Sequence, residues 1–221
     1  MTVKAILVDI EGTTTSISFV FDVLFPYARE HIAEFVRTNL ENPAIQRELE
    51  AINQEVGRQL TAEQAIEQLT SWIDRDRKVT PLKALQGMIW KQGYVDKAFT
   101  GHVYPDAVRC LRQWRDNGIK LYVYSSGSVQ AQKLLFGYSD SGDLTPLFTG
   151  YFDTGVGMKR DSTSYRKISA EIGLDAGDIL FLSDIVEELD AAREAGMQTA
   201  WLVRDGQGDP ESGHPVCHDF S

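Results

Sequence analysis

The sequence predicts an α/β fold with a doubly wound, Rossmann-like parallel sheet as its core and a helical segment inserted after the first strand. Two short, mainly apolar runs, Ala5–Asp9 and Asp178–Asp184, end in a carboxylate and are typical of buried parallel strands. Strand and helix patterns alternate from about residue 100 onward, as a parallel sheet requires. Between these regions, residues 19–92 show helical spacing and no convincing strand.

The first strand and the turn after it organise the prediction. Ala5–Asp9 is aliphatic up to its final carboxylate, and Gly12 ends the run. Ligands of parallel α/β sheets lie just outside the carboxyl ends of the strands, so Asp9 is carried towards a site. Glu11 lies two residues further on, and an extended backbone points both carboxylates the same way. Taken alone, this stretch is equally well explained as a strand, a turn and a helix cap.

The helical segment is predicted to be a domain of its own. We expect residues 1–15 and 100–221 to form the sheet domain and residues 16–99 to form the insertion. Apolar residues recur at helical spacing throughout the insertion. Turn and capping signals divide it into helices that begin near Phe19, Pro43, Thr61 and Pro81.

The rest of the chain alternates between helices and strands. The loop of residues 137–149 is polar and rich in glycine, so we expect it to be mobile. The tail of residues 205–221 is rich in Gly, Pro and Asp, and we expect it to be loosely ordered. Helices are predicted to begin near Pro105, Val129, Thr163 and Glu187, and strands to cover residues 119–124, 151–153, 178–184 and 199–203.

Composition excludes several classes of protein. The net charge is -10 over 221 residues and no basic run occurs, which argues against nucleic-acid binding. No apolar run approaches the length that spans a bilayer, and the start of the chain lacks the features of a signal peptide. Cys110 and Cys217 have no metal-like spacing and are interpreted as free thiols in a reducing compartment. We therefore expect a soluble, cytoplasmic protein that binds neither nucleic acid nor a membrane, and we expect it to be a monomer.

Polar side chains follow three of the predicted strands, and a lysine precedes a predicted helix between the last two. Each of these residues alone has an ordinary explanation as a helix cap or a solvated side chain. Because the carboxyl ends of parallel strands meet at one edge of a sheet, their convergence predicts a single site. The residues are Asp9, Glu11, Ser125, Ser126, Lys159, Ser183 and Asp184.

Phosphoryl transfer to a carboxylate is the chemistry that needs this set. Asp9 is the candidate nucleophile, because a carboxylate can form an aspartyl-phosphate. Asp9 and Asp184 can together hold Mg²⁺, without which the carboxylates would repel a phosphate. Lys159 adds a second positive charge. Glu11 is placed to protonate the leaving oxygen and then to activate water.

The phosphate itself is expected to bind where the second polar strand end meets a helix. Ser125 and the backbone N–H groups of Ser126 and Gly127 precede that helix. Helix N-termini favour anions because their first N–H groups lack partners within the helix.

These residues resemble the motifs of the haloacid-dehalogenase-like phosphatases. Most members have Asp where this chain has Glu11, and Glu at this position resembles the acireductone synthase, or enolase-phosphatase, family of methionine salvage. The resemblance spans residues 3 to about 204. It rests on Asp-Ile-Glu-Gly-Thr-Thr at 9–14, Asp-Arg-Lys at 76–78, Leu-Lys-Ala-Leu-Gln-Gly at 82–87, Trp90 with Gly93-Tyr94, Tyr-Ser-Ser-Gly-Ser at 124–128, Gln132 to Gly137, Tyr151-Phe-Asp-Thr, Lys159, Ser164-Tyr165 and Phe181 to Asp184.

The resemblance implies a bifunctional, Mg²⁺-dependent enzyme. It would enolise 2,3-diketo-5-methylthiopentyl-1-phosphate and then remove the phosphate, giving the acireductone 1,2-dihydroxy-3-keto-5-methylthiopentene. The helical insertion would be a cap that closes over the site. By motif position, the metal ligands would be Asp9, Asp184 and the carbonyl of Glu11, and the phosphate would be held by Ser125, Ser126 and Lys159. Two interpretations of Glu187 and Glu188 stay open: one of them orients metal-bound water or Lys159, or both begin a helix with favourable charge.

Two other functions stay open at this point. The first keeps the phosphatase chemistry but changes the substrate to another small phosphomonoester, such as a sugar phosphate or phosphoglycolate. The second is a phosphoacceptor signalling domain, which also places an Asp, a Ser or Thr, and a Lys on a doubly wound sheet. Sustained phosphate release from a generic aryl phosphate would separate turnover from a single phosphorylation.

Overall fold

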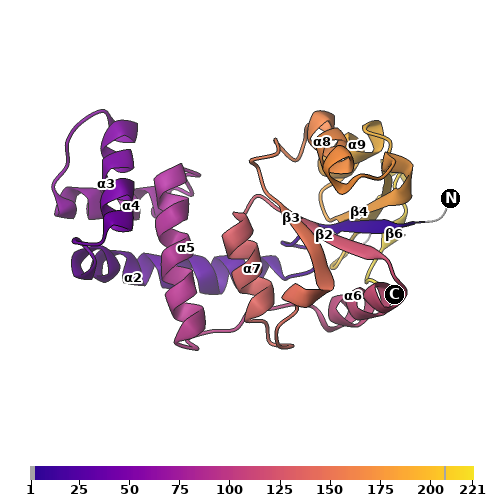
Figure 1. The fold of residues 1–221 in the computed structure, drawn as a ribbon, viewed down its shortest axis with the longest axis horizontal. Coiled ribbons are helices and arrows are strands. Elements are labelled where there is room, and N and C mark those ends of the chain that lie inside the picture. Colours follow the sequence, from indigo (N-terminus) through magenta and orange to yellow (C-terminus); the bar gives the residue numbers. More distant parts are fainter. Residues whose placement is uncertain (1–2, 207) are drawn as a thin grey trace. The chain divides into compact units, whose positions relative to one another are not determined.

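The computed structural model describes residues 3–206 and 208–221, and the chain divides into two compact units (Figure 1). One unit, called the sheet unit here, contains the residues up to Ile17 together with Thr100–Ser221. The other, the helical unit, is Ser18–Phe99. Each unit has a hydrophobic core of its own.

The sheet unit is built on six parallel strands in the order β3-β2-β1-β4-β5-β6. This confirms the doubly wound, parallel sheet predicted from the sequence. Its order reverses beside β1, which places the end of that strand where α/β sheets bind ligands. The strands are β1 (Ala5–Val8), β2 (Lys120–Tyr124), β3 (Phe148–Phe152), β4 (Ile179–Ser183), β5 (Gln198–Leu202) and β6 (Val216–Cys217).

Strand β1 is central because its side chains are aliphatic on both faces. All four of its residues are buried, and it pairs in parallel with β2 on one side and β4 on the other. A strand covered on both faces needs a continuous apolar run rather than alternation. Asp9 follows directly, and its backbone N–H still donates to Leu182 O at 2.9 Å, so the carboxylate starts from a fixed backbone.

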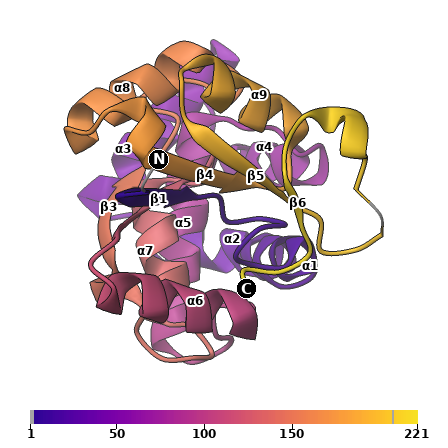
Figure 2. The ribbon, with the colours of Figure 1, turned by 90° about the vertical axis from the view of Figure 1, so that its right-hand side faces the viewer.

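Helices cover both faces of the sheet (Figure 2). α6 (Pro105–Asp116) and α7 (Val129–Gly137) lie on one face, and α8 (Ser162–Ile172) and α9 (Val186–Glu194) lie on the other. Local signals set their starts. Pro105 occupies the first turn of α6, Ser128 caps α7 and Asp161 caps α8. Short 3₁₀ turns occur at Thr145–Leu147, Ala176–Asp178 and Pro210–Ser212.

The helical unit consists of helices around an aliphatic core that includes Ile32, Ile52, Leu69 and Leu85. Its caps follow the sequence signals, with a capping box at Thr61 and a left-handed Gly57 after the preceding helix. No helix in the described part of the chain is long and apolar enough to cross a membrane. From the short α1 (Ile17–Phe19), the elements run through a π-helical turn (Val20–Leu24), α2 (Phe25–Thr38), α3 (Pro43–Val56), α4 (Ala62–Asp74) and α5 (Thr80–Val95).

The prediction for residues 137–153 is wrong in part. Strand β3 begins at Phe148 rather than Tyr151, and a 3₁₀ turn precedes it. Leu144 and Phe148 are buried, which anchors the segment expected to be a mobile loop. The sequence does not reveal the start of this strand because Thr149 and Gly150 resemble a loop. The strand forms here because it pairs with β2, and this pairing outweighs its own propensity.

The expectation of a loosely ordered tail is also wrong for the described residues; Gln207 lies outside them. Strand β6 pairs in parallel with β5. Phe220 is buried and its ring stacks on Trp114 of α6, with the centroids 5.6 Å apart. Figures 1 and 2 both place the C-terminus beside α6. Pairing with a sheet edge and one buried aromatic ring order a segment whose composition is typical of a loop.

Candidate active site

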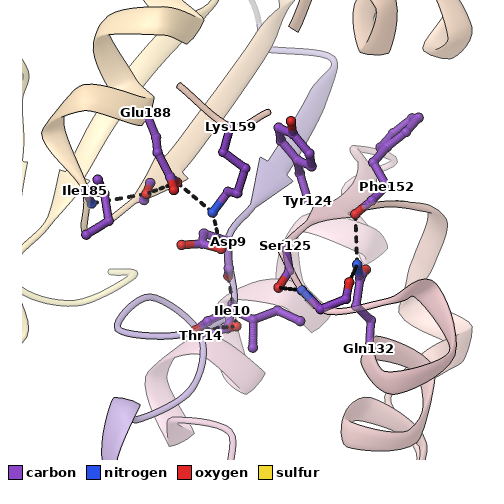
Figure 3. A network of polar contacts seen from close by, with 12 residues as sticks. Asp9, Ile10, Thr14, Tyr124, Ser125, Gln132, Phe152, Lys159, Ile185 and Glu188 are labelled. Carbon is purple, nitrogen blue, oxygen red and sulfur yellow. Dashed lines mark hydrogen bonds and ion pairs between the residues drawn. The ribbon is translucent and has the colours of Figure 1, made fainter. Parts of the chain in front are cut away.

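The predicted residues follow β2, β1 and β4, three neighbouring strands of the sheet, and Figure 3 shows Asp9, Ser125 and Lys159 among them. Asp9 follows β1, Ser125 follows β2 and Asp184 follows β4. Lys159 comes from the loop between β3 and α8, and its side chain points to Asp9. Topology therefore brings together residues up to 175 positions apart, as the strand-end pattern predicts.

Lys159 forms a buried ion pair with two carboxylates. Its Nζ lies 2.6 Å from Asp9 Oδ1 and 2.6 Å from Glu188 Oε2, and its side chain is only 9% exposed. Burial alone would lower the pKa of Lys159, but the two carboxylates outweigh it and hold the pKa above its usual value. The lysine is therefore an ammonium ion that fixes the Asp9 side chain.

Glu188 is the glutamate that orients Lys159, while Glu187 is exposed. Burial and the charge of Asp9 raise the pKa of Glu188, and contacts with Lys159 and Ser183 oppose the rise. The Ser183 hydroxyl donates to Glu188 Oε2 at 3.0 Å. Helical spacing in the sequence could have distinguished Glu188 from Glu187. Ala191 and Ala192 lie three and four residues after Glu188 and are buried, so they mark the inward face of α9.

Three side-chain hydroxyls hold the loop that carries Lys159 by donating to its successive backbone carbonyls. Tyr124 Oη donates to Gly157 O at 3.0 Å, and Ser164 Oγ donates to Met158 O at 2.8 Å. The buried Tyr165 Oη donates to Lys159 O at 2.7 Å. A loop with few backbone partners of its own is thus fixed by side-chain hydroxyls, which positions the lysine before any ligand arrives.

Removing one of these hydroxyls tests the arrangement. Tyr165→Phe should lower the free energy of unfolding by about 1–2 kcal/mol, because a buried carbonyl loses its donor. It should also weaken binding of inorganic phosphate several-fold, measured by calorimetry, because Lys159 is held less firmly. Tyr151→Phe is the matched control, since that buried hydroxyl has no hydrogen-bond partner among the described residues. Equal effects of the two substitutions would contradict the role of Tyr165.

The turn after Asp9 is tightly constrained. Thr14 Oγ1 donates to the carbonyl of Asp9 at 3.0 Å, and Glu11 forms a parallel bridge with Thr15. Gly12 has a φ of 73°, and a Cβ at this position would lie 2.2 Å from Asp184 Oδ2. Only glycine fits both the left-handed backbone and this approach, so the turn is packed directly against the second carboxylate.

One carboxylate oxygen of Asp184 is left without a hydrogen-bond partner among the described residues. That oxygen, Oδ1, is buried. Burial, followed by the nearby charge of Asp9, raises the pKa of Asp184 to about 7. An unsatisfied buried carboxylate beside another carboxylate is a suitable place for a hard divalent cation.

The donor set suits Mg²⁺, which takes oxygen ligands. Two carboxylates with carbonyl and water ligands are the usual surroundings of Mg²⁺. The residues present therefore fit the predicted ion.

The raised pKa of Asp184 predicts how stability depends on pH in metal-free protein. The folded pKa is about 7 against 3.8 for the ordinary group. As pH rises from about 4 to about 7, the unfolded chain loses this proton first, so the folded state binds more protons and its stability falls. Asp184→Asn should remove this fall, making the variant more stable than the original protein above about pH 7 but not near pH 4. Urea unfolding with EDTA across this range measures it, and a pH-independent difference would contradict it.

The serines after β2 are arranged only partly as predicted. Ser125 is buried, and its Oγ accepts the backbone N–H of Gly127 at 3.1 Å. That N–H, predicted to grip a phosphate, is thus engaged within the turn. The hydroxyl proton of Ser125 is not used in accepting this bond and can be donated to an anion. Ser126 is exposed and Ser128 caps α7, so neither Ser125 nor Ser126 acts as the helix cap.

Comparisons with known proteins identify the family of the chain. A family model described as haloacid dehalogenase-like hydrolase matches residues 3–196. Enolase-phosphatase E1 of Pseudomonas aeruginosa strain UCBPP-PA14 is 58% identical over 222 residues, which cover 100% of this chain and 98% of that protein. The protein of the same name from Azotobacter vinelandii is 56% identical over 222 residues, which cover 100% of this chain and 97% of that protein.

A solved structure extends the agreement to the fold. The crystal structure of UTR4 protein from Saccharomyces cerevisiae superimposes with a TM-score of 0.84 at 32% sequence identity, covering 99% of both chains. The family model, the relatives that match over nearly their whole length and the fold agree with one another. The chain belongs to the haloacid dehalogenase-like hydrolases and, within them, to the enolase-phosphatase E1 family.

Proposed function

We propose that this protein is the enolase-phosphatase, or acireductone synthase, of methionine salvage. It converts 2,3-diketo-5-methylthiopentyl-1-phosphate to 1,2-dihydroxy-3-keto-5-methylthiopentene and phosphate. The observation that carries the proposal is identity of 56–58% over the whole chain with proteins named enolase-phosphatase E1. The buried pair of Asp9 and Lys159 supports the phosphatase half of the reaction.

In that half, Asp9 is the nucleophile. A carboxylate oxygen of Asp9 attacks phosphorus, the bond between phosphorus and the substrate oxygen breaks, and Glu11 gives that oxygen a proton. Glu11, now a carboxylate, takes a proton from water, whose oxygen attacks the aspartyl-phosphate and releases phosphate and Asp9. Lys159 keeps Asp9 in place and offsets the charge of the incoming phosphate, which Ser125 and Ser126 help to bind.

Asp9 and Asp184, with the carbonyl of Glu11, would hold Mg²⁺. When bound, the ion supplies positive charge that lets a phosphate approach the carboxylates. The unpaired Oδ1 of Asp184 supports this assignment. In the same proposal, the helical unit of residues 18–99 acts as the cap domain, which excludes water during turnover.

Turnover of the diketone phosphate is the direct test. Purified protein with Mg²⁺ should first produce a conjugated chromophore from the enol and then release phosphate in repeated turnovers. Equal or faster hydrolysis of sugar phosphates or phosphoglycolate, with no chromophore from the diketone, would favour the other phosphatase function. A single stoichiometric phosphorylation would favour a phosphoacceptor domain, against which the family membership argues.

Glu11→Gln tests how the two half-reactions are divided. The amide cannot exchange a proton, whereas the backbone carbonyl of residue 11 is retained. We expect dephosphorylation to slow by roughly 10²–10⁴-fold, the usual contribution of a general acid-base group. The enol phosphate should then accumulate, visible as a chromophore that persists. If the diketone phosphate stays unchanged instead, Glu11 also serves the enolisation, and this division is wrong.

A further inference from the structure

The turn of residues 10–15 is held from outside as well as from within. Gly12 N–H donates to Thr15 O at 2.8 Å, and Thr13 N–H donates to Ile10 O at 3.2 Å. A guanidinium from beyond β5 completes these contacts. We propose that Arg204 is a positioning residue for the Asp9–Thr15 turn and that the C-terminal segment holds Arg204 in place. The proposal rests on the proposed function, because the turn matters through Asp9 and Glu11.

Arg204 binds the turn with two donors. Its Nε and Nη2 donate to the carbonyl oxygen of Thr13 at 3.1 and 2.7 Å. Its Nη1 donates to Asp106 Oδ2 at 2.8 Å, and the Arg204 side chain is only 11% exposed. A planar guanidinium with a paired charge and three directed hydrogen bonds has little freedom, so the Thr13 carbonyl is held in one position.

The C-terminal segment fixes the guanidinium itself. The Arg204 guanidinium carbon lies 4.0 Å from the ring centroid of Tyr104 and 5.2 Å from that of Phe220. The backbone N–H of Phe220 donates to Asp106 Oδ2 at 3.0 Å, the same oxygen that pairs with Arg204. The last residues of the chain thus supply both an aromatic face and a donor to this arrangement.

Holding Thr13 also holds the catalytic geometry. Thr13 is two residues from Glu11 and adjacent to Gly12, which packs against Asp184. Tyr104 N–H donates to Thr14 O at 2.9 Å, so the next peptide is fixed from the same side. A displacement of about 1 Å in such a turn is enough to lower a rate by on the order of 10²-fold. Arg204 lies beyond residue 196, where the hydrolase family model ends.

Arg204→Met tests the proposal, because it removes the donors while keeping an unbranched side chain between the rings. We expect kcat to fall about tenfold or more with KM changed less than about threefold, since a shifted turn harms the reacting groups more than substrate binding. Hydrogen exchange of the Gly12 and Thr13 amides should become faster. In Arg204→Ala, where the shorter side chain leaves room for the ion, millimolar guanidinium should restore part of kcat, and the same concentration of NaCl should not.

Arg193→Met is the matched control. Arg193 Nη1 donates to Gly213 O at 3.0 Å, so it ties the same segment to α9 without contacting the turn. It should leave kcat and the turn amides unchanged. Unchanged kcat and amide exchange in Arg204→Met, or changes equal to those of Arg193→Met, would overturn the proposal.

Two further arrangements keep the outcome interpretable. If Arg204→Met does not fold, Phe220→Leu removes the second ring while retaining the backbone donor to Asp106, and it should show the same changes at a smaller size. Unchanged kcat and amide exchange in that variant would count against the proposal. Amide exchange needs no substrate, so it tests the role of Arg204 even if the unmodified protein fails to turn over the diketone phosphate.

Discussion

Asp9→Asn is expected to abolish phosphate release while the protein stays folded. An amide is a poor nucleophile toward phosphorus, and loss of a covalent nucleophile commonly lowers kcat by on the order of 10⁴-fold or more. The fold should survive because Lys159 keeps Glu188, 2.6 Å away, as a partner for its buried charge. Phosphate release measures the activity, and thermal unfolding measures the fold.

Asp205→Asn is a suitable control for this variant, since it removes one negative charge from an exposed position. It should behave as the unmodified protein does in both measurements. Turnover near the original rate in Asp9→Asn would remove Asp9 from the role of nucleophile. Loss of folding together with activity would instead show that the Asp9–Lys159 pair is needed for stability. The rate of phosphate release would then be measured on the fraction of the variant that stays folded.

Removal of divalent metal is expected to abolish activity as completely as Asp9→Asn does. Above about pH 7, where Asp184 is ionised, Asp9, Asp184 and Glu188 bring three carboxylates to the site, and Lys159 carries only one positive charge to offset them. A phosphate carrying two negative charges would be repelled from this arrangement. EDTA should therefore stop phosphate release and MgCl₂ should restore it. Full activity of protein shown by elemental analysis to contain no metal would contradict this expectation.

Substitution should separate the carboxylate that binds the metal from its neighbours. Asp184→Ala should raise the Mg²⁺ concentration needed for half-maximal activity well above that of the unmodified protein. Glu187→Ala is the matched control, because Glu187 is exposed and lies in the first turn of α9. Calorimetric titration with MgCl₂ gives the same comparison without substrate. Similar Mg²⁺ affinities in the two variants would assign the metal to other residues.

The sequence predicts the strand-borne half of the site well, for a physical reason. Asp9 and Asp184 directly follow short buried strands, and in a parallel sheet strand ends meet at one edge whatever the intervening length. Lys159 was predictable by its junction with a helix and by the chemistry it completes. Predicting that Asp9, Lys159 and Asp184 come together required no information about how the helices pack.

The other half of the site depended on packing that the strand ends do not predict. Glu187 and Glu188 are neighbours of the same type, and only the phase of α9 against the sheet separates an exposed side chain from a buried one. Phe220 follows Pro and Gly residues typical of a loop, and its burial depends on Trp114, over 100 positions earlier. Contacts at such separation cannot be predicted from propensity.

The three hydroxyl contacts to residues 157–159 bear on which changes this loop tolerates. They bind consecutive carbonyls, so they specify the number of residues in the loop rather than their side chains. Met158 has its carbonyl held while its side chain is 69% exposed. Related chains should therefore vary in the side chain at residue 158 but conserve loop length, because inserting one residue would put each hydroxyl opposite the wrong carbonyl and move the lysine away from Asp9.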